Sequence, residues 1–312
     1  MSPPKVSIVI VNWNGIEVLV PLLESLRALT YPNVETIVID NASGDGSAEI
    51  LARRDDIRFV ANDENVGFAR ASNQGMDMTD GEYVLLLNPD TLIDDPKVLD
   101  AAVDEMERER RIGALGVKIV APDGSLQYSC APFRTLSREL ALSAFARPFR
   151  RDGHPKFWHF QDGSPPRTMD VDWLSGAFML LRRAALDVAG TFDPRTFMDG
   201  EDYDLCWRLH RAGWRVRYLA ETRVVHIGNV SGAKRWTEYR RQVLGAQCMD
   251  YFQRKHHSVP YALAYRTLVV ADRAAKAAFA RARGDREWAA ALAEQRRVHA
   301  EALRTFFKTP PP

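Results

Sequence analysis

Residues 83–94 read YVLLLNPDTLID and place a carboxylate directly behind a buried strand. The first five residues are aromatic or aliphatic, as expected of a strand that is covered on both faces. The run stops at Asn88, Pro89 and Asp90, and two more acids follow closely. A capped turn would account for this stop, and so would a metal ion held by Asp90. The rest of the chain decides between the two interpretations.

Apolar strands alternate with helical patterns on both sides of this stretch. Strands are expected at 6–11, 36–39, 57–61, 83–87, 113–120, 177–182 and 214–225, and helices at 16–29, 67–78, 96–109 and 201–212. This alternation indicates βαβ units and a parallel sheet. Residues 121–172 are rich in Pro, Gly, Arg and aromatic residues and show no clear period. They are interpreted as a long excursion over one face of the molecule.

The composition is that of an ordinary globular protein with an uneven charge distribution. A chain of 312 residues that is 46% hydrophobic has room for one large α/β domain with an appendage. Residues 231–312 contain 16 Lys and Arg against 7 Asp and Glu, so the part before them is acidic. No apolar run reaches the roughly 18 residues that span a bilayer, and no signal-peptide pattern is present. The three cysteines lack metal-ligand spacing, which favours a reducing cytoplasm.

Polar side chains follow three of the predicted strands. They are Asn12 with Trp13, Asp40 with Asn41, and Asn88 with Asp90. In open parallel sheets the ligand lies at the carboxyl ends of the strands, so these groups are expected to converge on one crevice. The chain has neither a G-x-G-x-x-G turn nor a G-x-x-x-x-G-K-[ST] loop to hold a pyrophosphate. A divalent cation, which takes oxygen ligands, would supply the missing positive charge, and Asp90 suits that role.

A second group of carboxylates, Glu201, Asp202 and Asp204, begins a predicted helix. Acids in the first turn complement the helix dipole, which accounts for one or two of the three. The flanking residues are apolar and are expected to bury part of the group. A carboxylate held beside a hydroxyl can act as a general base, which typically contributes about 10²–10⁴-fold to a rate.

Seven segments, in this order, resemble family 2 glycosyltransferases, which have the GT-A fold. They are VSIVIVNWNG, VIDNASGDGS, NDENVGFARASNQG (62–75), LLLNPD, WLSGAFMLLRR, FMDGEDYDLCWRLHRAGW and VVHIGNVSG, between about residues 5 and 232. Within the family, the chain is most similar to bacterial rhamnosyltransferase-like enzymes of cell-surface polysaccharide synthesis. The resemblance implies a Rossmann-like, mostly parallel sheet flanked by helices over residues 1–232. A helical C-terminal extension is expected over 233–312.

The resemblance also implies a role for each candidate site residue. The family's metal motif usually reads Asp-x-Asp, and here Asn88 takes the first position. Asp90 and His226 are expected to hold Mg²⁺ or Mn²⁺, and Asp202 to act as the base, with Glu201 as the less favoured alternative. The implied donor-binding residues are Asn12, Trp13, Asp40, Asn41, Asn65, Gly67, Phe68, Asn73 and Asn88, and the acceptor-binding residues are Trp173, Ser175 and Gly176. Capping and turn formation are the alternative for Asn65 and Asn73.

The implied activity is inverting transfer of a hexose by a single displacement. The donor would be a dTDP- or UDP-linked sugar, with rhamnose as one candidate, and the acceptor a hydroxyl of a glycan or a lipid-linked glycan. The alternative from another class is a catalytically inactive nucleotide- or carbohydrate-binding module, which only Asn88 favours. A nucleotidyltransferase would need a basic Gly-rich loop that NWNGIEVL does not provide.

The basic helical pattern at 260–283 leaves several partners open. It is consistent with packing on its own domain, with a homodimer, and with peripheral contact to an anionic membrane at the inner face of the cell membrane. No nucleic-acid partner is expected. The expected location is the cytoplasm, with or without this membrane contact.

Overall fold

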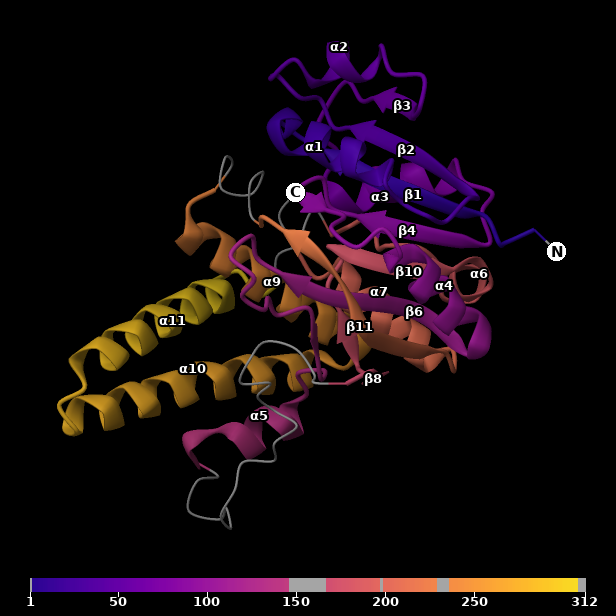
Figure 1. The fold of residues 1–312 in the computed structure, drawn as a ribbon. Coiled ribbons are helices and arrows are strands. Elements are labelled where there is room, and N and C mark those ends of the chain that lie inside the picture. The colour runs from indigo at the N-terminus through magenta and orange to yellow at the C-terminus, as the bar shows by residue number, and fades with distance from the viewer. Residues whose placement is uncertain (1, 146–166, 197–198, 229–235, 308–312) are drawn as a thin grey trace. The chain divides into compact units, whose positions relative to one another are not determined.

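The chain divides into two compact units in the computed structural model (Figure 1). The structure describes residues 2–145, 167–196, 199–228 and 236–307. The first unit comprises residues 1–132 and 159–235, and the second comprises 133–158 and 236–312. The second unit therefore takes a segment from inside the predicted first domain, and the domain boundary at 232 stays a prediction. Parts of two resemblance segments, 197–198 and 229–232, lie outside the described residues.

The first unit is built on a mixed, mostly parallel sheet, which confirms the predicted fold class. Its strand order is β3 (Arg58–Ala61), β2 (Val34–Asp40), β1 (Val6–Asn12), β4 (Tyr83–Leu87), β10 (Phe178–Arg182), β6 (Ile112–Val120), β11 (Arg215–His226) and β5 (Thr91–Leu92), and β8 (Met169–Asp170) pairs with β11. Among the described strands, β3, β2, β1, β4, β6 and β11 run in one direction, and β10, β5 and β8 run in the other.

The middle of this sheet is covered on both faces, as its sequence predicts. Every residue of β1 and of β4 is buried, and the two strands pair in parallel from Val6 opposite Tyr83 to Ile10 opposite Leu87. Continuous Val, Ile and Leu are the residues that such a doubly covered strand requires. The predicted range 83–87 is that of β4.

Two strands differ from the prediction in ways that shape the site. β10 is antiparallel to both β4 and β6, so its first residue, Phe178, lies opposite Leu87 at the end of β4. β11 continues beyond the core pattern to His226, with an irregularity between Leu219 and Arg223. The hydrophobic pattern of a short buried strand carries no information on its direction, so periodicity alone could not show the reversal of β10.

Helices flank this sheet. They are α1 (Ile16–Leu26), α2 (Ser47–Leu51), α3 (Phe68–Asp77), α4 (Val98–Arg108), α6 (Arg183–Ala189) and α7 (Glu201–Arg211). The sequence did not predict α6. A two-stranded ribbon joins β7 (Cys130–Ala131), within the predicted excursion 121–172, to β9 (Trp173–Leu174), directly after it.

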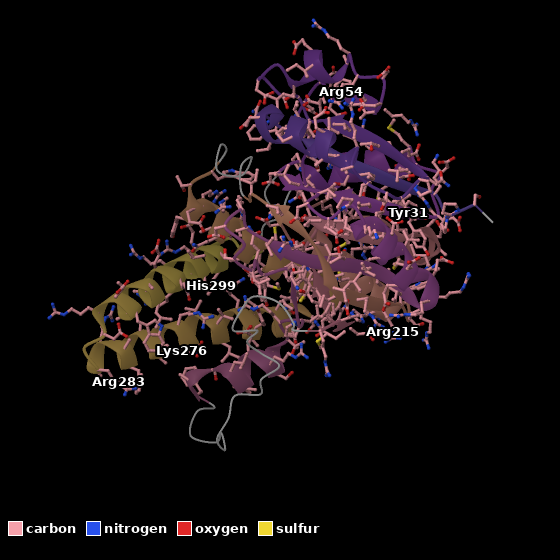
Figure 2. The ribbon with its side chains drawn as sticks, in the orientation of Figure 1. Tyr31, Arg54, Arg215, Lys276, Arg283 and His299 are labelled. Atoms are coloured by element: carbon pink, nitrogen blue, oxygen red, sulfur yellow. The ribbon has the colours of Figure 1, made fainter. Side chains whose placement is uncertain are left out.

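The second unit contains the helices α5 (Leu136–Leu142), α9 (Glu238–His256), α10 (Val259–Ala282) and α11 (Arg286–Arg304). Arg266 on α10, only 1% exposed, donates from Nε to Asp250 Oδ1 on α9 at 2.7 Å and from Nη1 to His299 Nδ1 on α11. Figure 2 labels His299 on α11. Burial lowers the pKa of His299 to about 3, so the ring is a neutral acceptor. No described helix is both long and apolar enough to span a membrane.

Helix α3 lies unusually close to the sheet because residue 75 is glycine. A Cβ atom built on Gly75 would be pressed into Val9 Cγ1 of β1, and Ile39 Cγ1 of β2 lies 3.4 Å away. Both strand residues are buried and have no room to move. Gly75 therefore sets the distance between α3, which follows the predicted donor loop, and the sheet.

We expect Gly75→Ala to destabilise the fold. Overpacking costs about 1–3 kcal/mol, more than the gain of up to about 1 kcal/mol in helix propensity. Gly245→Ala on α9 is the matched control, because no atom lies within 4 Å of the added methyl group. Thermal unfolding followed by circular dichroism should show a lower Tm for the first variant and an equal or higher one for the second. An unchanged Tm for Gly75→Ala would contradict the close packing of α3.

Candidate active site

Three segments of the first unit meet where β4 ends. The Asn88 backbone N–H donates to the Ala177 carbonyl at 3.1 Å, and the Ile227 N–H donates to the Asp90 carbonyl at 2.9 Å. His226 itself lies opposite Thr91, where β5 pairs with β11. The loop after β4 is therefore held between the residues that precede β10 and the end of β11. Of the polar strand ends that the sequence predicted to converge, Asn88 and Asp90 lie here, and a shared crevice with those of β1 and β2 stays a prediction.

Asp90 and His226 are brought together as a pair. His226 Nε2 lies 3.2 Å from Asp90 Oδ1, and both side chains are largely buried, with Asp90 6% exposed. Two adjacent ligands of an octahedral cation, each about 2.1 Å from the ion, stand about 3 Å apart, so this spacing suits a shared divalent ion. Carboxylate oxygen and imidazole nitrogen together are donors suited to Mn²⁺ as well as Mg²⁺. No group of three or more His, Cys, Asp or Glu placed for a metal occurs in the part of the chain that the structure describes.

Gln127 is a site residue that the sequence analysis missed. Its Nε2 donates to the His226 carbonyl at 2.7 Å, and its Oε1 lies 2.8 Å from His226 Nδ1. It belongs to the stretch 121–172, in which no periodic signal was present. A glutamine in such a loop has no sequence mark that separates it from an ordinary surface residue.

The other acids behind β4 have structural partners. Asp94 pairs with Arg223 at 2.9 Å, and Asp95 accepts from Thr222 Oγ1 at 2.5 Å, which fixes the irregular part of β11. A cavity of about 400 Å³ lies beside them. Its lining is Asp94, Asp95, Pro96, Lys118, Glu221, Thr222 and Arg223, and it includes none of the predicted site residues.

Asp202 is held at the start of α7 by two backbone donors. Its Oδ2 accepts from the Gly176 N–H at 3.0 Å, and its Oδ1 accepts from the Tyr203 N–H at 2.7 Å. Burial raises the pKa of Asp202 to about 6, and the nearby Trp173 indole N–H, which is outside hydrogen-bonding geometry, opposes this rise together with the two backbone donors. The carboxylate is therefore oriented, and it is ionised at neutral pH.

Glu201 differs from its neighbour although both begin the same helix. Its side chain is 6% exposed, and its Oε2 accepts no hydrogen bond from any described residue. Burial, together with the charges of Asp202 and Asp199, raises the pKa of Glu201 well above its usual value. The charged form of Glu201 is therefore strongly disfavoured. Asp199 (φ 68°) and Gly200 (φ 96°) both adopt left-handed backbone, a strained entry that sets how this helix begins.

Two of the predicted donor residues form a buried pair at the ends of β1 and β2. Asn12 Nδ2 donates to Asp40 Oδ1 at 2.7 Å, and the Asp40 carboxylate also accepts from the Ser43 hydroxyl and N–H. Asp40 is only 1% exposed, so these contacts fix the turn that follows it. Trp13 follows Asn12 and is half-buried. Contact of Asp40 with a pyrimidine base stays a prediction.

Asn41 and Asn65 organise the loop before α3. Asn41 Nδ2 donates to Asn65 Oδ1 at 2.9 Å and to the Gly67 carbonyl at 3.3 Å, and its Oδ1 accepts from the Val66 N–H. Asn65 Oδ1 also accepts from the Gly67 N–H, which is the turn-forming role left open for this residue. These contacts position Phe68, at the start of α3, whose ring centroid lies 6.1 Å from that of Phe192.

Asn73 joins α3 to the loop that contains Phe192. Its Nδ2 donates to the Phe192 carbonyl at 2.8 Å, and its Oδ1 accepts from the Phe192 N–H at 3.0 Å. It does not cap α3, whose N-cap is Gly67. A direct contact of Asn73 with a donor stays a prediction.

The predicted acceptor residues lie beside Asp202. The Ser175 N–H donates to the Ser129 carbonyl at 2.9 Å, and Gly176 donates to Asp202. Trp173 stands between two tyrosine rings, with centroid distances of 6.0 Å to Tyr128 and 6.4 Å to Tyr203. Tyr128, which the sequence analysis missed, is 59% exposed and offers an aromatic face next to the carboxylate.

A family model and characterised relatives match this chain over the same region. Residues 7–187 match the glycosyl transferase family 2 model. The N-acetylglucosaminyl-diphospho-decaprenol L-rhamnosyltransferase of Mycobacterium tuberculosis is 33% identical over 217 residues, which cover 65% of this chain and 70% of that enzyme. The O-antigen biosynthesis protein RfbC of Myxococcus xanthus is 31% identical over 239 residues, 73% of this chain but 18% of the longer protein.

The fold is shared with a solved glycosyltransferase structure. The mannosyltransferase PcManGT from Pyrobaculum calidifontis, solved in complex with GDP-Man and Mn²⁺, superimposes with a TM-score of 0.60. The alignment covers 98% of this chain and 87% of that protein at 19% identity, which shows a common fold alone. Taken together, the matches show that the chain belongs to glycosyl transferase family 2 and is a glycosyltransferase that uses a nucleotide-sugar.

We expect Glu201→Gln to leave stability nearly unchanged at pH 7. A neutral carboxyl group and an amide are alike in shape and charge, so the change in unfolding free energy should stay within about 1 kcal/mol. Asp204→Asn is the matched comparison, because Asp204 Oδ2 accepts from Arg208 Nε at 2.8 Å. The Asp204→Asn variant should lose more unfolding free energy, since the largely buried guanidinium of Arg208 loses its counter-charge. Urea unfolding tests both variants, and equal losses of unfolding free energy would contradict the raised pKa of Glu201.

Proposed function

As a member of glycosyl transferase family 2, this chain transfers a sugar, and we propose that it does so with inversion from a dTDP- or UDP-linked hexose. The acceptor is a hydroxyl of a lipid-linked or growing surface glycan. The product is a new glycosidic bond and a free nucleoside diphosphate. Asp90 and His226 hold Mg²⁺ or Mn²⁺ on the donor diphosphate, and Asp202 takes the proton of the acceptor hydroxyl.

One arrangement carries this proposal. The segment 175–177 donates from Gly176 to Asp202 Oδ2 and accepts at the Ala177 carbonyl from Asn88. The loop that contains Asp90 and the carboxylate of Asp202 are therefore both held by the same three residues. A donor diphosphate at Asp90 and an acceptor hydroxyl at Asp202 would be brought toward each other at this segment, as a single displacement requires.

Asp90 and His226 supply the two protein ligands. Both groups are fixed by backbone contacts, since the Asp90 carbonyl accepts from Ile227 and His226 lies in the β5–β11 ladder. When bound, the cation offsets the negative charge on the departing diphosphate. Asn88 takes the place of the first Asp in the family's metal motif. This replacement is compatible with the proposed site, because Asn88 Nδ2 lies 3.4 Å from His226 Nε2 and adds no charge.

Asp202 meets the requirements of a general base. A pKa of about 6 keeps it ionised at neutral pH while leaving it basic enough to accept a proton in the transition state. Its two backbone donors fix its direction. Glu201 is the weaker candidate because burial and the neighbouring acids raise its pKa well above the usual value, which disfavours the charged form that a base needs. Trp173 and Tyr128 provide aromatic surface on which an acceptor sugar can pack.

The relatives support the donor and the acceptor that we propose. The mycobacterial relative is named a rhamnosyltransferase for a decaprenol-linked acceptor, and another matching protein for O-antigen biosynthesis. We assign this chain to surface polysaccharide assembly, with a deoxyhexose such as rhamnose as the transferred sugar. The basic helices of the second unit suit a membrane-bound acceptor, because residues 231–312 contain 16 Lys and Arg against 7 Asp and Glu.

Asp90→Ala should abolish metal-dependent donor binding. Calorimetric titration of the wild-type chain with UDP and with dTDP should show binding that needs Mn²⁺ and is lost in EDTA. Asp94→Ala is the matched control, because Asp94 pairs with Arg223 instead of His226. Nucleotide binding by Asp90→Ala as tight as that of wild type would remove Asp90 from the metal site. Absence of any nucleotide binding in the wild type would favour the inactive-module alternative.

Asp202→Asn should leave donor binding intact and reduce transfer about 10²–10⁴-fold, since only the base is lost. Glu201→Gln serves as its neighbour control and should retain most of the activity. Sugar transfer from radiolabelled donor measures both. If donor binding and transfer fall together in Asp202→Asn, Asp202 is not the base.

The pH profile gives a further check on Asp202. The protonated form cannot act as the base, so kcat/KM should fall about tenfold per pH unit below the pKa of about 6 and level off above it. The acid limb should be absent from the residual activity of Asp202→Asn. An acid limb that persists in that variant would assign the ionisation to another group.

A further inference from the structure

We propose that Gln127 is a positioning residue that fixes which nitrogen of His226 carries the ring proton and so presents Nε2 to the cation. This inference rests on the proposed metal role of His226. Gln127 lies outside the seven segments that resemble the family. The proposal makes this loop glutamine part of the metal centre.

The chain brings Gln127 to His226 through a short hairpin at the end of β6. The Ala121 N–H donates to the Ser125 carbonyl at 2.8 Å, and the Gln127 N–H returns to the Ile119 carbonyl at 2.9 Å. The last residue of β6, Val120, pairs with Val225 of β11, next to His226. Gln127 is therefore anchored by its backbone across from His226 before any side-chain contact is made.

The donor and the acceptor in each hydrogen bond of the Gln127 side chain follow from the chemistry of the partner atoms. A carbonyl oxygen only accepts, so the amide atom that faces the His226 carbonyl at 2.7 Å must be the nitrogen, Nε2. The other amide atom, Oε1, then faces His226 Nδ1 at 2.8 Å and can only accept. Nδ1 must supply the proton of that bond. In the neutral ring, Nε2 is then the nitrogen with the lone pair.

This lone pair points at the predicted metal position. His226 Nε2 lies 3.2 Å from Asp90 Oδ1 in a largely buried site, so in the neutral ring with the proton on Nδ1 two electron-rich atoms face each other. Their repulsion is relieved by positive charge between them, which a divalent cation supplies. Asn88 Nδ2, at 3.4 Å from the same nitrogen, is the donor type that an unprotonated Nε2 accepts.

Residues that hydrogen-bond to a metal-ligating histidine, as Gln127 would, generally influence metal binding. Such partners fix the tautomer and the plane of the ring, and their loss typically weakens metal binding about 10–100-fold. Gly228 packs on the same pair, since a Cβ there would lie 3.7 Å from His226 Nδ1 and 3.8 Å from Gln127 Nε2. The ring is thus held from its outer side, and Nε2 is left for the ligand.

A purely structural role for Gln127 makes a different prediction. In that case the bond to the His226 carbonyl would only fasten the hairpin to β11, and the ring nitrogen would not depend on it. Two variants separate the roles. Gln127→Glu keeps an acceptor for Nδ1–H but alters the bond to the carbonyl, and Gln127→Leu removes both. Gln295→Leu, at an exposed position of α11, is the matched control for the substitution itself.

The first measurement is the tautomer of His226 in the metal-free full chain. Histidine labelled with ¹⁵N, observed at a pH where the ring is neutral, distinguishes Nδ1–H from Nε2–H, and His226→Gln identifies the signal among the seven histidines. We expect Nδ1–H in the wild type and in Gln127→Glu, and loss of that preference in Gln127→Leu. Nε2–H in the wild type, or an unchanged tautomer in Gln127→Leu, would overturn the proposal.

The second measurement is Mn²⁺ affinity in the presence of UDP, followed by electron paramagnetic resonance of the free ion. Gln127→Leu should bind Mn²⁺ about 10–100-fold more weakly, while Gln127→Glu and Gln295→Leu stay close to wild type. Equal affinity in Gln127→Leu would overturn the role in metal binding. If the wild type binds no Mn²⁺, the proposed metal fails, and the tautomer of the metal-free chain still decides whether Gln127 positions His226. Should Gln127→Leu not fold, the wild-type and Gln127→Glu spectra decide the question.

Discussion

The position of β10 between β4 and β6, antiparallel to both, is the constraint on which the site depends. In a sheet whose strands all ran one way, the residues before a strand would lie at the edge away from the ligand. Reversal of β10 moves Gly176 and Ala177 to the edge where β4 ends. From there, Gly176 orients Asp202, and Ala177 accepts from Asn88, the first residue of the loop that contains Asp90. One strand direction thus connects the predicted metal pair with the predicted base.

The surroundings of Glu201, Asp202, Asp90 and His226 suit these side chains to different chemical roles. Glu201 and Asp202 begin the same helix and are both buried, yet the Asp202 carboxylate accepts from the backbone N–H groups of Gly176 and Tyr203, which oppose the rise of its pKa, while the pKa of Glu201 is raised well above its usual value. Pairs of carboxyls pushed apart in this way are typical of sites that move protons. Asp90 and His226 instead face each other across 3.2 Å, an arrangement suited to a shared cation. In our account, the two halves of the site handle a proton and a diphosphate separately.

Much of this could be predicted from the sequence because it rests on local pattern. The continuous apolar residues of β1 and β4 indicated strands that are covered on both faces. The polar residues that follow these strands predicted the edge of the sheet at which a ligand would bind. The direction of β10 was not predictable, since Phe178 to Arg182 read the same either way. Gln127 was missed because a contact across 99 residues leaves no local trace. Asn41 and Asn73 contact loop backbone and side chains, which spacing could not show, and their predicted contact with the donor stays a prediction.

The central claim is that Asp90 and His226 share a divalent cation that receives the donor diphosphate. The most direct test is a crystal structure of the chain grown with UDP and Mn²⁺, with diffraction data collected at the manganese absorption edge. Our account predicts one anomalous peak within bonding distance of Asp90 and His226 Nε2, with diphosphate oxygens on its open side. A manganese peak bound elsewhere, or a nucleotide bound at this edge without contact to either residue, would contradict it.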